Sequence, residues 1–210
     1  MKKLIAVITV ATALVLTGCS QVGAAATVGS VKITEAQVQK SIDAALAERK
    51  KVDTTGMQLE TGAAFNRNQL RFHLISTLLS AVVGDLKITV TKAEIDARRA
   101  QILTQLGGVA NLPKALVGAG IASADFDEYL QLILFSEKLA AAEVAAGVKE
   151  ADTGTAIQKL VVAKAKKIGV TVNPKYGKWD PATGDVLPLD AASPAASPAA
   201  TPSTSATSTP

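Results

Sequence analysis

The sequence contains a single cysteine, Cys19, and a single histidine, His73, among its 210 residues. One residue of each kind cannot build a Cys/His metal site, and a lone cysteine cannot form an intramolecular disulfide. Aromatic residues are also scarce, at 3% of the chain, whereas surfaces that bind single-stranded nucleic acid rely on exposed aromatic faces. We therefore expect no metal site, no cofactor and no nucleic-acid partner.

Neither sign of charge dominates the chain. It has 22 Lys and Arg against 18 Asp and Glu, which gives a net charge of +4. Lys2 and Lys3 lie in a segment that we expect to be removed, which leaves 20 basic against 18 acidic residues. No basic block is dense enough to suggest a phosphate-binding surface. The charge balance therefore agrees with the exclusion of a nucleic-acid partner.

A long apolar run is missing as well. Lys2 and Lys3 precede the mainly apolar segment 4–16, whose 13 residues fall short of the roughly 20 that a membrane-spanning helix needs. This pattern is typical of a secretory signal peptide. The sequence Leu-Thr-Gly-Cys that ends at Cys19 resembles the bacterial lipobox, in which the cysteine is lipidated and becomes the first mature residue. We predict a lipoprotein signal peptide over 1–18; the alternative is an ordinary signal peptide that contains a buried free cysteine.

A lipid on Cys19 would hold the protein at the extracytoplasmic face of the cell membrane, because two or more acyl chains anchor a protein stably. Residues 19–26 then form a linker, and residues 27–190 are enough for one folded domain. Residues 191–210 contain only Ala, Ser, Pro and Thr and carry no charge. Such a segment cannot bury enough apolar surface to order itself, so we expect a disordered tail that is either plain or O-glycosylated.

Apolar residues recur with helical spacing through most of 27–190. We predict helices over about 34–51, 63–83, 91–106, 111–118, 123–146 and 155–168, with N-caps at Thr34, Thr91, Asn111 and Ser123. β-branched residues predict a short strand or hairpin arm over 25–33, a strand over 170–172 and a terminal hairpin or arm over 176–187. The expected fold class is therefore mainly α with a small β element.

The predicted helix over 63–83 is apolar around most of its circumference, which is typical of a central, buried helix. A narrow polar stripe remains, and it comprises Asn66, Gln69, His73, Ser76, Thr77, Ser80 and Gly84. We expect His73 on this stripe to be half-exposed or hydrogen-bonded. A role for His73 in pH sensing or partner contact is the alternative.

Three segments, in this order, resemble the chaperone domain of SurA-type and PrsA-type extracytoplasmic foldases. Residues 27–46 (TVGSVKITEAQVQKSIDAAL) resemble the opening strand and first helix of that family, with Gly29–Ser30 in place of the more usual Asn-Gly turn. Residues 87–102 (KITVTKAEIDARRAQI) resemble its Thr-capped helix with an acidic start. Residues 120–139 (GIASADFDEYLQLILFSEKL) resemble the Leu-rich helix that follows.

The resemblance implies a SurA N-terminal-like multi-helix domain that binds unfolded or extended segments of exported polypeptides without a covalent step. In the family, a parvulin-type prolyl isomerase domain is usually inserted before the last helix. Here that position holds only Val148–Gly154, and the paired histidines of a parvulin site are missing. We therefore expect a chaperone without enzyme activity and assign no client-binding residues. The alternatives are a scaffold lipoprotein that binds one dedicated partner and, with less support, a prolyl isomerase.

The predicted strand near the N-terminus has no strand beside it in sequence, and an isolated strand is unstable. The final helix must return toward this strand to bury its own apolar face. We therefore predict that Val170–Val172, or the arm after it, pairs with the N-terminal strand. Trp179 would cover the junction, and a cleft between the helices would point away from the membrane anchor.

The substitution Cys19→Ala removes the sulfur atom that would carry the lipid. We expect the variant to leave the membrane fraction or to remain unprocessed, as cell fractionation and the mass of the mature chain would report. Unchanged processing and membrane association would contradict the predicted anchor.

Overall fold

The computed structural model describes residues 22–190. The predicted signal peptide over 1–18, Cys19 and the predicted tail over 191–210 lie outside the described residues. The helices are α1 (Glu35–Arg49), α2 (Gly62–Asp85), α3 (Lys92–Gln105), α4 (Leu112–Ala119), α5 (Phe126–Ala145) and α6 (Thr153–Ile168). The strands are β1 (Ala24–Val28), β2 (Val31–Thr34), β3 (Val170–Val172), β4 (Lys178–Asp180) and β5 (Asp185–Leu187). The expected fold class, mainly α with a small β element, is confirmed.

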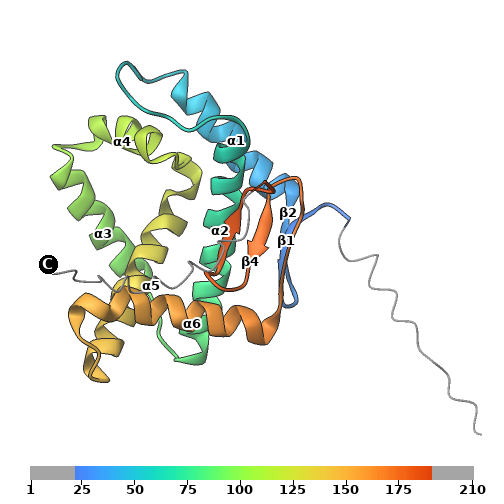
Figure 1. Ribbon diagram of the computed structural model, residues 1–210. Coiled ribbons are helices and arrows are strands. Elements are labelled where there is room, and N and C mark those ends of the chain that lie inside the picture. Colours follow the sequence, from blue (N-terminus) through green and yellow to red (C-terminus); the bar gives the residue numbers. More distant parts are fainter. Residues whose placement is uncertain (1–21, 191–210) are drawn as a thin grey trace, which may run out of the picture.

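Helix α2 runs through the middle of the molecule (Figure 1). It contacts α1, α5, α6, both strands of the first hairpin and β5. Its apolar side chains form the centre of the main core, where Leu70, Leu74 and Leu78 are completely buried. The sequence-based prediction of a central, buried helix is therefore confirmed.

The first sheet joins the two ends of the described chain. Its strand order is β2-β1-β3, and both pairings are antiparallel. In the β1–β3 pair, Ala26, Thr27 and Val28 face Val172, Thr171 and Val170. The predicted pairing of residues 170–172 with the N-terminal strand is thus confirmed. The expectation that this strand has no partner beside it in sequence was wrong, because β1 and β2 already form a hairpin of their own.

The tip of the β1–β2 hairpin is fastened to the end of α6. Gly29 has a φ of +59°, which favours glycine, and its N–H donates to the Gly169 carbonyl oxygen over 2.8 Å. A Cβ atom at Gly29 would lie only 3.4 Å from the Cβ atom of Ile168. The turn therefore brings the backbone close to the helix.

The folded region begins earlier than the predicted boundary at residue 27. Residues 24–26, which the sequence analysis placed in the linker, belong to β1 and are almost completely buried, with exposed fractions of 5%, 0% and 2%. Alanine is small enough for a strand to pack directly against α2. The predicted linker is shortened accordingly.

Strands β4 and β5 form a separate two-stranded sheet, as predicted for a terminal hairpin. The hairpin is attached to α2 by the ion pair between Arg71 Nε and Asp185 Oδ1, at 2.8 Å. Trp179 is half-buried on β4, and its ring lies near Gly184, which also approaches Val162 of α6. Trp179 therefore packs against the core from this second hairpin rather than from within the sheet formed by β1, β2 and β3.

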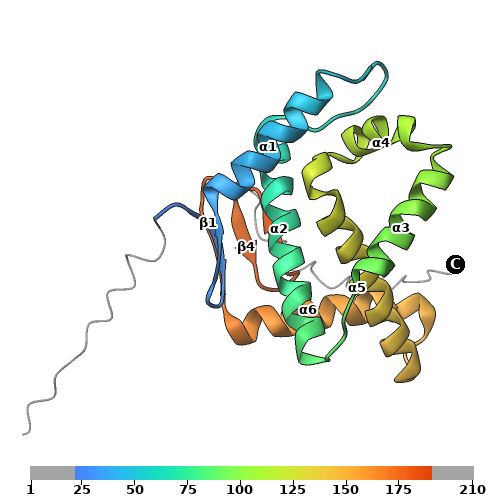
Figure 2. The same ribbon diagram turned by 180° about the vertical axis from the view of Figure 1, so that it is seen from behind.

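Helices α3, α4 and the start of α5 form a lobe on one side of α2 (Figures 1 and 2). The lobe has its own small core, in which Leu116, Phe126 and Leu130 are buried. In α3 no side chain is fully buried, although Ile95 and Ile102 pack against this core. The lobe is therefore held by fewer buried apolar side chains than the main core.

Two of the predicted helix caps have the expected side-chain hydrogen bonds. The Thr34 hydroxyl accepts from the backbone N–H of Gln37, and Thr91 forms a complete capping box with Glu94. The side chain of Gln37, three residues after Thr34, does not bond back to this cap; its amide nitrogen lies 3.5 Å from a ring nitrogen of His73. A contact between α1 and α2 therefore takes the place of a local hydrogen bond of the Gln37 side chain.

Neither of the other two predicted caps forms the expected side-chain hydrogen bond, although Asn111 does occupy the N-cap position of α4. Asn111 makes no side-chain cap at α4 and instead donates to the Leu106 carbonyl oxygen over 2.6 Å. Ser123 begins a short 3₁₀ turn ahead of α5, and its backbone N–H donates to the Glu48 carboxylate. This bond ties the start of the lobe to α1.

Truncation after Ile168 should destabilise the whole domain. It removes β3, the partner of β1, together with the buried side chains of Tyr176 and Val186, both 4% exposed. Complete burial of a side chain of this size contributes about 1.5–3 kcal/mol, so we expect the free energy of unfolding to fall by more than about 3 kcal/mol in chemical denaturation. Deletion of residues 191–210 is the matched control and should leave the midpoint unchanged. A truncated domain that unfolds like the full one would contradict the conclusion that β3 and the second hairpin stabilise the domain.

Candidate functional site

A groove of about 840 Å³ lies along α2, between α5 on one side and the β1–β2 hairpin tip and α6 on the other. We call it the central groove. It is lined by Val28, Gly29, Ser30, Val31, Ser76, Thr77, Ser80, Ala81, Ile95, Asp127, Glu128, Gln131, Leu132, Phe135, Lys164 and Ile168. Its size is in the range of pockets that bind ligands.

Both apolar and polar side chains line the central groove. The apolar side chains include Val31, which is 50% exposed, and Leu132 and Ile168. The polar side chains include Thr77 and Ser80, which carry hydroxyl groups and belong to the polar stripe of α2. The groove can therefore bury apolar groups and also bind polar ones.

Every charged side chain that lines the central groove is paired with a residue outside the lining. The three pairs are Asp127 with Arg99, Glu128 with His73, and Lys164 with Asp85. The Lys164 and Asp85 side chains are 2.7 Å apart. Each charged group of the groove thus already has an ionic or hydrogen-bonded partner within the fold.

His73 lies beneath the groove, at the junction of α1, α2 and α5. It is only 2% exposed. Its Nε2 atom is 3.0 Å from the Ser41 hydroxyl oxygen, and its Nδ1 atom is 3.5 Å from Glu128 Oε1. With the ring proton on Nδ1, the ring donates to Glu128 and accepts from Ser41. The hydrogen-bonded alternative for His73 is therefore confirmed, and the half-exposed alternative was wrong.

These neighbours change the pKa of the Glu128 carboxyl group. Burial by itself raises the pKa of its carboxyl group, but three effects outweigh burial: the hydrogen bond from the His73 ring, the positive charge of that ring when it is protonated, and the nearby Ser76 hydroxyl. The pKa therefore lies below its ordinary value of 4.5. The folded protein therefore favours the carboxylate form of Glu128.

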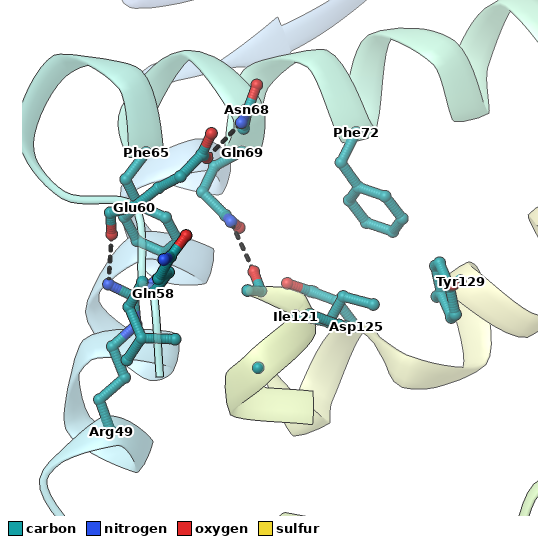
Figure 3. Close-up of a pocket in the computed structure, with 14 residues that line it drawn as sticks. Arg49, Gln58, Glu60, Phe65, Asn68, Gln69, Phe72, Ile121, Asp125 and Tyr129 are labelled. Atoms are coloured by element: carbon teal, nitrogen blue, oxygen red, sulfur yellow. Dashed lines mark hydrogen bonds between the residues drawn. The ribbon is translucent and has the colours of Figure 1, made fainter. Parts of the chain in front are cut away.

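A second hollow, of about 300 Å³, lies between the start of α2, the end of α1 and the turn that leads into α5 (Figure 3). No residue lines both hollows. Three of the seven aromatic residues of the chain, Phe65, Phe72 and Tyr129, line this one. We call it the aromatic pocket.

One end of the aromatic pocket already holds a cation. The Arg49 guanidinium lies 4.0 Å from the centre of the Phe65 ring, and its Nη1 donates to the Glu60 carbonyl oxygen over 2.6 Å. Burial lowers the pKa of Arg49 from its ordinary value, while the charge of Glu60 opposes this change. The Glu60 carboxylate in turn accepts a hydrogen bond from the Asn68 amide.

The other end of the aromatic pocket has fewer internal contacts. Gln69 is held by its amide donating to the Gly120 carbonyl oxygen over 2.7 Å. Figure 3 shows Phe72 pointing from α2 and Tyr129 rising from α5 into the pocket, with Asp125 beside them. The Oδ2 atom of Asp125 is buried and has no hydrogen-bond partner among the described residues.

The sequence analysis identified few of these residues. Cys19 lies outside the described residues, and no client-binding residue was assigned. Glu128 was not singled out as a site residue, and nothing local indicates that it faces His73 of another helix. Over residues 22–190, no group of three or more His, Cys, Asp or Glu could hold a metal ion. In the same part of the chain, no helix combines the length and apolar character needed to cross a membrane.

Comparison with protein-family models found no match. Searches of curated proteins and of solved structures found no significant match either. The resemblance to the extracytoplasmic foldases stays a prediction.

The substitution His73→Ala should destabilise the fold because it leaves Ser41 and the half-buried Glu128 without their partner. A buried polar group that loses its partner costs about 1–3 kcal/mol. We expect a loss of this size in denaturant unfolding at pH 7. Ser80→Ala, on the exposed part of the same stripe, is the control and should change stability little.

The pair of His73 and Glu128 also makes a prediction for acid. A carboxyl group with a lowered pKa stabilises the fold fully above pH 4.5, and this contribution is lost as the pH falls through the lowered pKa. The His73→Ala variant should therefore lose less additional stability between neutral and acidic pH than the unaltered protein. Parallel acid unfolding curves would contradict this assignment.

Proposed function

We propose that the protein is a membrane-anchored, extracytoplasmic, chaperone-like lipoprotein that binds unfolded or extended polypeptide segments non-covalently in the central groove. The observation that carries the proposal is the groove itself, which is open, about 840 Å³ in volume and lined by charges that are all internally paired. No covalent step is part of the proposal.

The lining of the groove is suited to an uncharged polypeptide segment. Apolar surface that the ligand and the groove bury together contributes about 25 cal/mol to the free energy of binding for each Å². An extended segment also carries backbone N–H and C=O groups that need partners once they leave water. Ser80 and Gln131 supply donors and acceptors for these groups. Thr77 supplies only an acceptor, because its hydroxyl already donates to the His73 carbonyl oxygen over 2.8 Å. A charged segment would find each charged group of the groove already engaged with a partner and would lose its hydration.

The predicted anchor precedes the start of β1 in sequence, and the groove lies at the other end of this strand. Cys19 is five residues from Ala24, where β1 begins, a span of at most about 18 Å. The groove touches the other end of the strand, at Val28 and the hairpin tip. A lipid on Cys19 would therefore hold the fold close to the membrane and leave the groove at the far end of the strand, accessible to exported chains.

A dedicated partner is the alternative occupant, and one observation favours it. Adaptable binding surfaces often use methionine, but Met57 lies outside the groove, with its Cε atom 3.0 Å from where a Cβ of Gly118 would be. A chaperone should bind several unrelated unfolded chains, whereas a scaffold should bind one partner and ignore the rest.

The substitution Ser80→Trp tests the proposal because it fills the groove from an exposed position on α2. We expect it to weaken binding of a panel of uncharged, extended polypeptides by at least about fivefold in fluorescence anisotropy, and to reduce suppression of aggregation in parallel. A fivefold change corresponds to about 1 kcal/mol.

Ala142→Trp is the matched control, since Ala142 is exposed on α5 and does not line the groove. It should bind the same panel as the unaltered protein does. Equal binding by both variants would contradict the groove as the binding site. Binding of one protein alone, with no affinity for the rest of the panel, would favour the scaffold.

A further inference from the structure

The aromatic pocket is not used by the proposed function and has chemistry of its own. We propose that it binds the cationic side chain of a lysine or arginine from a bound polypeptide, between Phe72, Tyr129 and Asp125. The inference rests on the proposed function in one respect, namely that the cation is supplied by a polypeptide chain.

The aromatic pocket already contains one contact between a cation and an aromatic ring. At its inner end the Arg49 guanidinium lies 4.0 Å from the centre of the Phe65 ring. The other end combines the rings of Phe72 and Tyr129 with the carboxylate of Asp125, whose buried Oδ2 atom has no hydrogen-bond partner among the described residues. Aromatic faces attract cations, and the attraction increases where water is excluded.

The second argument is the balance of charge. Two carboxylates, those of Glu60 and Asp125, line the pocket together with a single cation, Arg49. Arg49 contacts Phe65 and donates to the backbone of Glu60, and it makes no ion pair with Asp125 within the described residues. The pocket therefore has an excess of negative charge, which one alkylammonium or guanidinium group would balance.

The third argument concerns which polypeptide can supply the cation. Residues 191–210 contain no Lys or Arg, so the end of this chain cannot be the ligand. The charged groups of the central groove already have partners, whereas the aromatic pocket favours a positively charged group. The central groove would therefore bind an uncharged stretch of a polypeptide, and the aromatic pocket would bind a basic residue.

The experiment uses blocked seven-residue peptides of Ala and Ser with one central position changed. That position is arginine, lysine or citrulline, which has the shape of arginine without its charge. We expect the unaltered protein to bind the arginine peptide about tenfold more tightly than the citrulline peptide in isothermal titration. The difference should shrink at high salt, because an ionic contact near the surface is screened.

Two substitutions locate the contact. Asp125→Asn keeps the shape and removes the charge, so the preference for arginine over citrulline should fall to about one. Phe72→Leu removes a ring that belongs to neither buried core cluster, and it should weaken binding of the arginine and lysine peptides by at least about threefold. Asp43→Asn, at an exposed carboxylate of α1 outside both hollows, is the control and should retain the full preference.

Equal binding of the arginine and citrulline peptides would overturn the inference, as would an unchanged preference in Asp125→Asn. Thermal melting of each variant shows whether it is folded, and the lysine peptide offers a second readout on the same proteins. The Ser80→Trp variant separates this inference from the proposed function. If Ser80→Trp weakens binding of the extended polypeptides, but the unaltered protein does not prefer the arginine peptide over the citrulline peptide, the inference about the aromatic pocket is wrong. The proposed function of the central groove is then still supported. If the preference is present while Ser80→Trp binds long chains normally, the groove fails and the pocket stands.

Discussion

Ten side chains of α2 are buried, and they point in several directions around the helix. No single neighbour can cover such a surface, so α1, α5, α6 and the β1–β2 hairpin each bury part of it. These elements come from both ends of the described chain. To enclose α2, the C-terminal part of the described chain must therefore pack beside its N-terminal part. The β1–β3 pairing joins these two parts through backbone hydrogen bonds. The closure of the sheet follows from the burial of one helix.

The buried surface of α2 is not entirely apolar. Gln69, His73 and Ser76 are buried as well, and the first two are hydrogen-bonded to groups on other elements. A buried polar group needs a partner, which restricts how closely a neighbouring apolar face can pack. The two hollows lie on either side of this polar stretch, with Gln69 lining one and Ser76 lining the other. The same residues thus specify the packing of α1 and α5 and leave space for a ligand.

The two hollows differ in how their charges are used. In the central groove each lining charge already has a partner, as Lys164 has in Asp85. In the aromatic pocket the Asp125 Oδ2 atom has none among the described residues. Burial makes this difference matter, because an unpaired charge costs far more away from water than at the surface. A ligand therefore meets charges that already have partners in one hollow and a carboxylate with an unpaired oxygen in the other.

The sequence by itself determined the elements whose signals are local. The apolar rows of α2, the capping box of Thr91 and the end of α6 at Gly169 are encoded within a few neighbouring residues. The return of β3 to β1 was also predictable, because an unpaired strand and an unburied helix face leave few other arrangements. Only the tertiary structure decided the contacts between helices. That His73 meets Ser41 and Glu128, and that Phe72 and Tyr129 share a pocket, depends on the angle and rotation at which whole helices pack. That geometry is set by the combined burial of many side chains, so no short stretch of sequence contains it.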